Sequence, residues 1–149
     1  MNKVNHFLYQ NIDNSNHWII SEIILNQCKQ HPNNKIIQFV DGPEWSFDDL
    51  KNIAFEKAKT LRDLSINQGD TVTVMVDDPV DFIPYWVASS FLGVMFVALN
   101  TALKGSVLLH QIRLANSNVI IVSDVYYEDV AQLVQENKSK IKVLICSKL

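Results

Sequence analysis

Residues 93–124 decide the fold, and they read G-V-M-F-V-A-L-N-T-A-L-K-G-S-V-L-L-H-Q-I-R-L-A-N-S-N-V-I-I-V-S-D. The pattern predicts a buried strand at Met95–Leu99, a turn opened by Asn100-Thr101, a short helix at Ser106–Ala115 and a second strand at Val119–Val122. Strands of continuous apolar residues joined through a helix are typical of parallel sheets, whose strands are buried on both faces.

The same alternation of helix and strand continues on both sides of this stretch. We therefore predict an α/β fold with a mostly parallel sheet and helices on both faces. Residues 1–16 are polar and Asn-rich and are predicted to form a poorly ordered lead-in, while residues 17–149 form the α/β domain. The further predicted helices are His17–Gln30, Ser46–Leu64, a helix from Asp78-Pro79 to Gly93, and Tyr126–Asn137, and the further strands are Lys35–Val40, Thr71–Val76 and Ile141–Cys146.

Two helix starts are clearly marked. Ser46 followed three residues later by Asp49 resembles a capping box, although Glu or Gln is commoner at the second position. Asp78 before Pro79 suits an N-cap followed by proline at the first helical position. The helix after Pro79 is predicted to turn Phe82, Tyr85, Trp86, Ser89 and Leu92 toward the core.

Composition and charge exclude several classes of protein. The 149 residues are 48% hydrophobic with a formal charge of −3, so a core can form and no basic field attracts nucleic acid. The lysines at 138, 140 and 142 are interpreted as a solvated helix end. Two cysteines, Cys28 and Cys146, share no metal-ligand spacing and are predicted to be reduced, which suits a cytoplasmic protein.

The sequence predicts neither a secretory signal nor a membrane span. The N-terminus has no apolar segment of the kind found in secretory signals. The final Ser147-Lys148-Leu149 matches a peroxisomal address, or is chance. The uncharged run Phe82–Leu103 is long enough to span a bilayer, but Pro84 and Gly93 interrupt it, and a buried helix followed by a buried strand explains it better.

Candidate chemical groups each have a plainer structural explanation. Four glycines in the chain form no phosphate-binding loop, which excludes nucleotide sites of those types within these residues. Asp77, Asp78 and Asp81 could bind a divalent cation, although helix capping is the commoner role, and no metal site is assigned. The aromatic residues Tyr85, Trp86, Phe91 and Phe96 are interpreted as core packing.

Nucleophilic and cationic candidates lie on or near the predicted helix at Ser106–Ala115. Ser106 and His110 have the spacing of a nucleophile and its base, but no positioned acid accompanies them, so a surface histidine is favoured. Lys104 and Arg113 lie in one loop-helix unit and could meet a cofactor phosphate, or they form a solvated surface. The other histidines, His6, His17 and His31, share no ligand spacing.

Three motifs, in order, resemble the N-terminal part of AMP-forming acyl-CoA ligases, the adenylate-forming superfamily. They are Trp45-Ser46-Phe47-Asp48-Asp49-Leu50, Gly69-Asp70-Thr71-Val72-Thr73-Val74, and the segment Asp77–Leu103. Each motif is weak alone, whereas the ordered set covers nearly the whole chain from residue 17. The sequence departs from the family pattern at Asp77-Asp78, where Asn is usual, and at Val97-Ala98-Leu99, where Val-Pro-Leu is usual. The segment Asn100–Gly105 with Leu108-Leu109-His110 is most similar to ligases of the carnitine/crotonobetaine and fatty-acid type.

The resemblance implies a two-step reaction in which ATP, Mg²⁺ and CoA take part. A carboxylate attacks the α-phosphate of ATP to give an acyl-adenylate, and the CoA thiol then displaces AMP. In the family's sequences, the phosphate loop, the adenine-binding segments and the catalytic lysine all come after the part that this chain resembles. They have no counterpart here, so no catalytic residue is carried over. Some members place a cation near the CoA nucleotide two residues after the turn Asn. Here that position is Ala102, and Lys104 is the nearest candidate for the CoA phosphate.

The resemblance therefore predicts a fragment that is inactive alone, with a carboxylic acid and CoA as substrates of the parent enzyme. Its expected partners are the C-terminal portion of the same enzyme and, in a dimer, a second copy. Two alternatives stay open. One is a stand-alone, non-enzymatic α/β interaction domain that pairs with a separate chain, and the other is an unrelated doubly wound small-molecule binder with a pocket at the carboxyl ends of its strands.

Overall fold

The computed structural model describes residues 19–137 and 140–148, and the chain divides into two units, residues 1–52 and 53–149. The predicted lead-in at 1–16 lies outside the described residues. In the first unit, α1 (Ile20–Gln30) precedes a hairpin of β1 (Lys35–Gln38) and β2 (Glu44–Ser46). The two strands are antiparallel, with Gln38 opposite Glu44. The predicted strand at Lys35–Val40 thus ends two residues early, where the turn before β2 begins.

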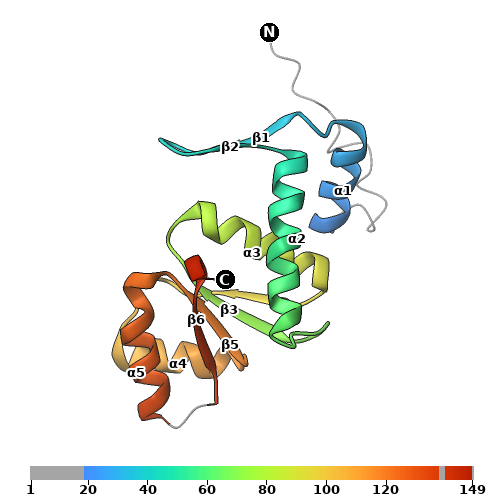
Figure 1. Cartoon of the computed structure of the whole chain (residues 1–149). Coiled ribbons are helices and arrows are strands. Elements are labelled where there is room, and N and C mark those ends of the chain that lie inside the picture. Colours follow the sequence, from blue (N-terminus) through green and yellow to red (C-terminus); the bar gives the residue numbers. More distant parts are fainter. Residues whose placement is uncertain (1–18, 138–139, 149) are drawn as a thin grey trace. The chain divides into compact units, whose positions relative to one another are not determined.

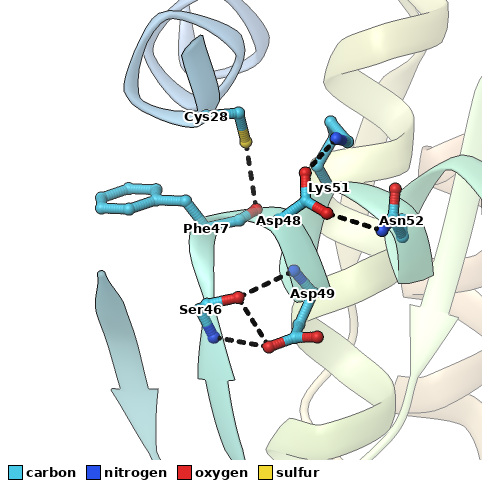
Figure 2. A network of polar contacts seen from close by, with 7 residues as sticks. All are labelled: Cys28, Ser46, Phe47, Asp48, Asp49, Lys51 and Asn52. Carbon is cyan, nitrogen blue, oxygen red and sulfur yellow. Dashed lines mark hydrogen bonds and ion pairs between the residues drawn. The ribbon is translucent and has the colours of Figure 1, made fainter. Parts of the chain in front are cut away.

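Helix α2 (Phe47–Asp63) begins at the capping box that the sequence predicts. The backbone N–H and the hydroxyl of Ser46 both donate to Asp49 Oδ2, at 2.9 and 2.6 Å, and the Asp49 N–H donates to Ser46 Oγ at 3.1 Å (Figure 2). These bonds satisfy N–H groups that a helix start leaves without a partner. Leu50, Ala54 and Leu61 recur at helical spacing along α2, and all three are buried.

The second unit is built on a four-stranded parallel sheet with the order β4-β3-β5-β6 (Figure 1). Its strands are β3 (Thr71–Met75), β4 (Met95–Ala98), β5 (Val119–Val122) and β6 (Lys142–Ile145). The connecting elements are α3 (Pro79–Leu92), α4 (Gly105–Ala115), the 3₁₀ helix η3 (Asp124–Tyr126) and α5 (Tyr127–Glu136), and η4 (Cys146–Lys148) follows β6. The predicted fold class is confirmed.

Alternate residues of the central strands supply two separate hydrophobic cores, one on each face of the sheet. Val74 and Ile121 pack with Tyr85 and Ala88 of α3. Met75 and Ile120 face the other way, into a core with Leu108 and Ile112 of α4 and Val130 and Val134 of α5. Because side chains alternate along a strand, a continuous apolar run such as Val119–Val122 serves both cores at once.

Helix α3 begins at the predicted cap, but one of its aromatic side chains faces away from the core. Its predicted cap is confirmed: the Asp78 carboxylate accepts from the Val80 N–H at 2.8 Å, and Pro79 occupies the first turn. Trp86, which was predicted to face the core, is instead 43% exposed. Tyr85 fills the core position, and a helix turns about 100° per residue, so its neighbour Trp86 points toward solvent.

The segment Phe82–Leu103 is not a single helix, because it is divided between α3 and β4. In the part of the chain that the structure describes, no helix combines the length and the apolar character that crossing a bilayer requires.

Candidate functional site

Three polar side chains from two separate segments meet at the carboxyl edge of the sheet, where β3 and β5 end. Ser123 Oγ donates to Asp77 Oδ1 at 2.7 Å, and Tyr126 Oη donates to Asp77 Oδ2 at 3.0 Å. Asp77 directly follows the buried Val76, and Ser123 and Tyr126 follow β5. The Asp77 carboxylate therefore joins the loop after β3 to the loop after β5.

These hydrogen bonds favour the ionised carboxylate. The hydroxyl of Ser123 is the largest cause that lowers the pKa of Asp77, and the Tyr126 hydroxyl and nearby backbone N–H groups lower it further. Desolvation acts in the opposite direction and is outweighed. Asp77 thus holds a fixed negative charge at this edge of the sheet.

The strand order makes this edge a natural binding place. After β3 the chain adds β4 on one side, and it then returns to add β5 on the other side. Open α/β sheets bind ligands in the crevice outside the carboxyl ends of the strands at such a reversal. Asp77, Ser123 and Tyr126 lie at that point.

Lys104 lies at the same edge, in a hollow of about 280 Å³ whose lining includes Leu108, Asp129 and Glu136. The turn that places it is an Asx turn, since Asn100 Oδ1 accepts from the Ala102 N–H at 2.9 Å. Lys104 Nζ forms an ion pair with Asp129 Oδ2 at 2.7 Å, and this hydrogen bond raises the pKa of the lysine. Because both side chains are more than half exposed, the pair is weak and open to exchange.

The three carboxylates that the sequence groups together have separate partners. Asp77 binds Ser123 and Tyr126, Asp78 caps α3, and Asp81 Oδ2 accepts from Cys146 Sγ at 3.4 Å. Within residues 19–137 and 140–148, no three His, Cys, Asp or Glu side chains converge as a metal site would require. Capping, the simpler interpretation, thus explains Asp78.

The nucleophilic and cationic candidates on or next to α4 do not form one site. Ser106 and His110 are both exposed on α4, as the surface interpretation expects. Lys104 and Arg113 stand at opposite ends of α4, about 13 Å apart along the helix axis at 1.5 Å per residue. They line different hollows, so they cannot hold one phosphate together.

Both cysteines are free thiols, as predicted. Cys28 Sγ donates to the Phe47 carbonyl at 3.1 Å in the first unit (Figure 2). Cys146 is buried, and its burial, with Asp81 adding to the effect, raises the pKa of the thiol to about 11. A thiol of that kind stays protonated and is a poor nucleophile.

The family comparison covers most of the chain. Residues 24–148 match the model of the AMP-binding enzymes. The chain belongs to the AMP-binding enzyme family. It therefore shares that family's N-terminal sequence pattern, as the three motifs indicate.

Individual relatives of this AMP-binding chain are longer ligases. A 2-succinylbenzoate–CoA ligase of Oceanobacillus iheyensis is 30% identical over 108 residues, which is 72% of this chain and 22% of that protein. A 4-coumarate–CoA ligase of Vanilla planifolia is 25% identical over 97 residues, 65% of this chain and 18% of that protein. The chain thus spans about a fifth of the length of these curated relatives.

Solved structures agree with the fold. The structure of VinN with L-aspartate superimposes with a TM-score of 0.78 at 18% identity, covering 87% of this chain and 32% of that one. At this identity the likeness establishes the fold alone. It confirms the α/β fold that the sequence predicts.

Ser123 and Tyr126 were not predicted as site residues from the sequence. A signal was available, because both residues directly follow the strongest strand prediction, Val119–Val122, and polar groups at the carboxyl ends of parallel strands often face ligands. Their pairing with Asp77 required knowledge that β3 and β5 are neighbours.

Proposed function

We propose that residues 17–149 form the N-terminal α/β subdomain of an ATP-dependent, AMP-forming acyl-CoA ligase. The observation that carries this proposal is the family match over residues 24–148, joined to a parallel sheet of the same architecture. Because the relatives are several times longer, the proposal places the catalytic groups outside these residues. The chain alone is then a scaffold without turnover.

The proposed reaction couples a carboxylic acid to CoA through an acyl-adenylate, with release of pyrophosphate and then AMP. In such phosphoryl chemistry, positioning and electrostatic stabilisation do most of the work. Mg²⁺ neutralises phosphate charge in this reaction. Since no three ligand side chains converge in the described part of the chain, we assign no Mg²⁺ ligand to it.

For the acid, the proposal is a carnitine/crotonobetaine or fatty-acid substrate. The support is the sequence Asn100–Gly105 with Leu108-Leu109-His110. The two curated relatives described above act, by their names, on 2-succinylbenzoate and 4-coumarate, so the assay panel should contain aromatic acids as well. A cytoplasmic location and a homodimer belong to the same proposal.

Lys104 is the proposed contact for a CoA phosphate. It lies in the hollow at the carboxyl edge, and its exposed pair with Asp129 can yield to a phosphate of higher charge. In a longer protein that contains these residues, Lys104→Ala should raise the KM for CoA about tenfold with little change in the KM for ATP. Asp129→Asn, which releases Lys104, should lower the CoA KM. An unaltered CoA KM in both variants would remove Lys104 from the proposal.

The test of the scaffold proposal is isothermal titration of the 149-residue chain with Mg-ATP and then CoA. Pyrophosphate release is followed in parallel with a panel of crotonobetaine, carnitine, fatty and aromatic acids. We expect neither tight binding nor release. Saturable ATP binding together with pyrophosphate release would place a nucleotide site within these residues and would contradict the proposal.

A further inference from the structure

A second hollow of about 280 Å³ opens at the amino edge of the sheet, opposite the edge that carries Asp77 and Lys104. It lies where the turn after α4 enters β5 and where the chain enters β6. Arg113 and Lys140 are its cationic residues, and Asn116, Ser117 and Asn118 are its neutral polar residues. Ile112 and Ile141 also line it. We call this the amino-edge hollow.

The charge of the amino-edge hollow is unusual for this chain. The chain has a formal charge of −3, yet the described residues that line the hollow include two cations and no Asp or Glu. The carboxyl end of α4 adds a partial negative charge there, about half an elementary charge. Two full positive charges outweigh it, so the hollow attracts an anion.

Arg113 is held in place before any ligand arrives. Its Nη2 donates to Asn137 Oδ1 at 3.0 Å, and Asn137 Nδ2 donates in turn to the Leu133 carbonyl at 2.8 Å. A guanidinium has five N–H donors in a fixed fork, so this one bond restrains the exposed side chain and leaves further donors for an oxyanion. Such orientation by a second residue reduces the entropy lost on binding.

The polar wall is also fixed to the centre of the sheet. Asn116 ends α4 in the left-handed conformation, with φ of 49°, which turns the chain sharply into the hollow's wall. Ser117 is buried, and its hydroxyl lies 2.7 Å from Thr73 Oγ1 of the central strand β3. The Lys142 N–H donates to the Asn118 carbonyl at 2.9 Å, which ties the wall to the entrance of β6.

We propose that the amino-edge hollow binds a phosphate group, either as inorganic phosphate or as a compact phosphate monoester. Arg113 and Lys140 together suit a phosphate dianion better than they suit a carboxylate, which carries one charge. The volume lies just below the roughly 300 Å³ at which pockets for drug-sized ligands begin, which favours a small ligand. This site is independent of the proposed ligase function, because it lies at the other edge of the sheet.

The test is a two-dimensional ¹⁵N–¹H NMR titration of the 149-residue chain at constant ionic strength with sodium phosphate, phenyl phosphate or sodium acetate. With phosphate we expect saturable shifts of the backbone amides of 116–118 and of the Arg113 Nε–H. Tighter binding of phenyl phosphate than of phosphate would identify a monoester as the ligand, whereas the reverse order would identify inorganic phosphate. Acetate binding as tight as phosphate would overturn the assignment of a phosphate site.

Matched variants separate a site from general charge attraction. Arg113→Gln and Lys140→Gln should each weaken phosphate binding about tenfold. The controls make the same charge changes elsewhere: Arg62→Gln and Lys59→Gln, both at exposed positions of α2, should leave the Kd within about twofold. Equal weakening in all four variants, no saturable shift, or shifts confined to 104–108 and 129–136 would overturn the proposal.

Discussion

At the scale of single residues, Asp77 shows how much one side chain can connect. It accepts hydrogen bonds from hydroxyls that lie 46 and 49 residues further along the chain, so one carboxylate ties together the loops that follow two neighbouring strands. Its partners also hold its pKa below the ordinary value of 3.8. The hydrogen bonds that join the two loops are therefore the same ones that lower the pKa of Asp77.

Asp77→Asn should lower the free energy of unfolding at pH 7 by about 1 kcal/mol, since hydrogen bonds to an exposed charged group contribute less than buried ones. The folded-state pKa is lowered, so the stabilisation is complete above the unfolded value near 3.8 and is lost as the pH falls through the folded value. Urea unfolding of wild type and variant should thus show a difference that shrinks below about pH 4.

Glu56→Gln is the control for that comparison, because Glu56 is exposed on α2 and the change should alter stability by less than about 0.5 kcal/mol. A difference between wild type and Asp77→Asn that stays constant from pH 7 to pH 3 would show that the ionised carboxylate is not what stabilises the loops.

Ser46 provides a second prediction at this scale. Its hydroxyl accepts from the Asp49 N–H and donates to the Asp49 carboxylate, so Ser46→Ala removes both bonds at the start of α2. The expected loss is about 1 kcal/mol of unfolding free energy. Ser106→Ala, an exposed change in the first turn of α4, should have an effect within about 0.5 kcal/mol, and equal losses in both variants would contradict the capping role.

At the scale of elements, glycines decide where helices end and begin. Gly93 ends α3 with φ of 65°, and Gly105 begins α4 with φ of 53°. Both angles lie in the left-handed region, which side chains with a Cβ rarely adopt. The difference between the two sites is space: a Cβ on Gly93 would lie 3.1 Å from Gln68 Cγ, whereas a Cβ on Gly105 would meet nothing within 4 Å beyond its chain neighbours and the backbone of its own helix.

Comparing Gly93→Ala with Gly105→Ala therefore separates two costs in unfolding free energy, the strain of the left-handed backbone and the crowding of the added Cβ. Each variant should lose about 1 kcal/mol of unfolding free energy for the left-handed conformation, and Gly93→Ala should lose more because Gln68 must move. Thermal or urea unfolding measures both. A larger loss at Gly105 than at Gly93 would show that the contact with Gln68 carries no cost.

At the scale of the whole molecule, a single buried hydrogen bond links the centre of the sheet to the amino-edge hollow. Thr73 Oγ1 and Ser117 Oγ lie 2.7 Å apart, and neither residue is more than 4% exposed. Removing one partner leaves the other hydroxyl buried and unpaired, which costs about 1–3 kcal/mol. Removing both leaves no unpaired group.

A double-mutant cycle tests this link. Thr73→Val and Ser117→Ala should each destabilise the chain by about 1–3 kcal/mol, and the double variant should lose no more than either single one. Strictly additive losses would mean that the two hydroxyls do not depend on each other in the folded protein.

The sequence alone determined the main helices and the parallel strands, and the capped starts of two helices, because these depend on neighbours close in the chain. The apolar run Val119–Val122 predicted a doubly buried strand, and Ser46 with Asp49 and Asp78 with Pro79 predicted the starts of α2 and α3, all of which the structure confirms. The three ordered motifs also pointed to the AMP-binding family, which the comparison bears out. Trp86 was assigned to the core wrongly because residues 82–88 of α3 are all apolar or aromatic and give no clear periodic signal of the outer face of the helix.

Only the tertiary structure decided which distant residues meet. The strand order β4-β3-β5-β6 places Ser123 and Tyr126 against Asp77, and it leaves Lys104 and Arg113 in hollows at opposite edges of the sheet. Strand order depends on pairing between segments that are far apart in sequence, and periodicity reports only which face of each segment is apolar. Residues that act together across the sheet therefore carry no local signal of their proximity.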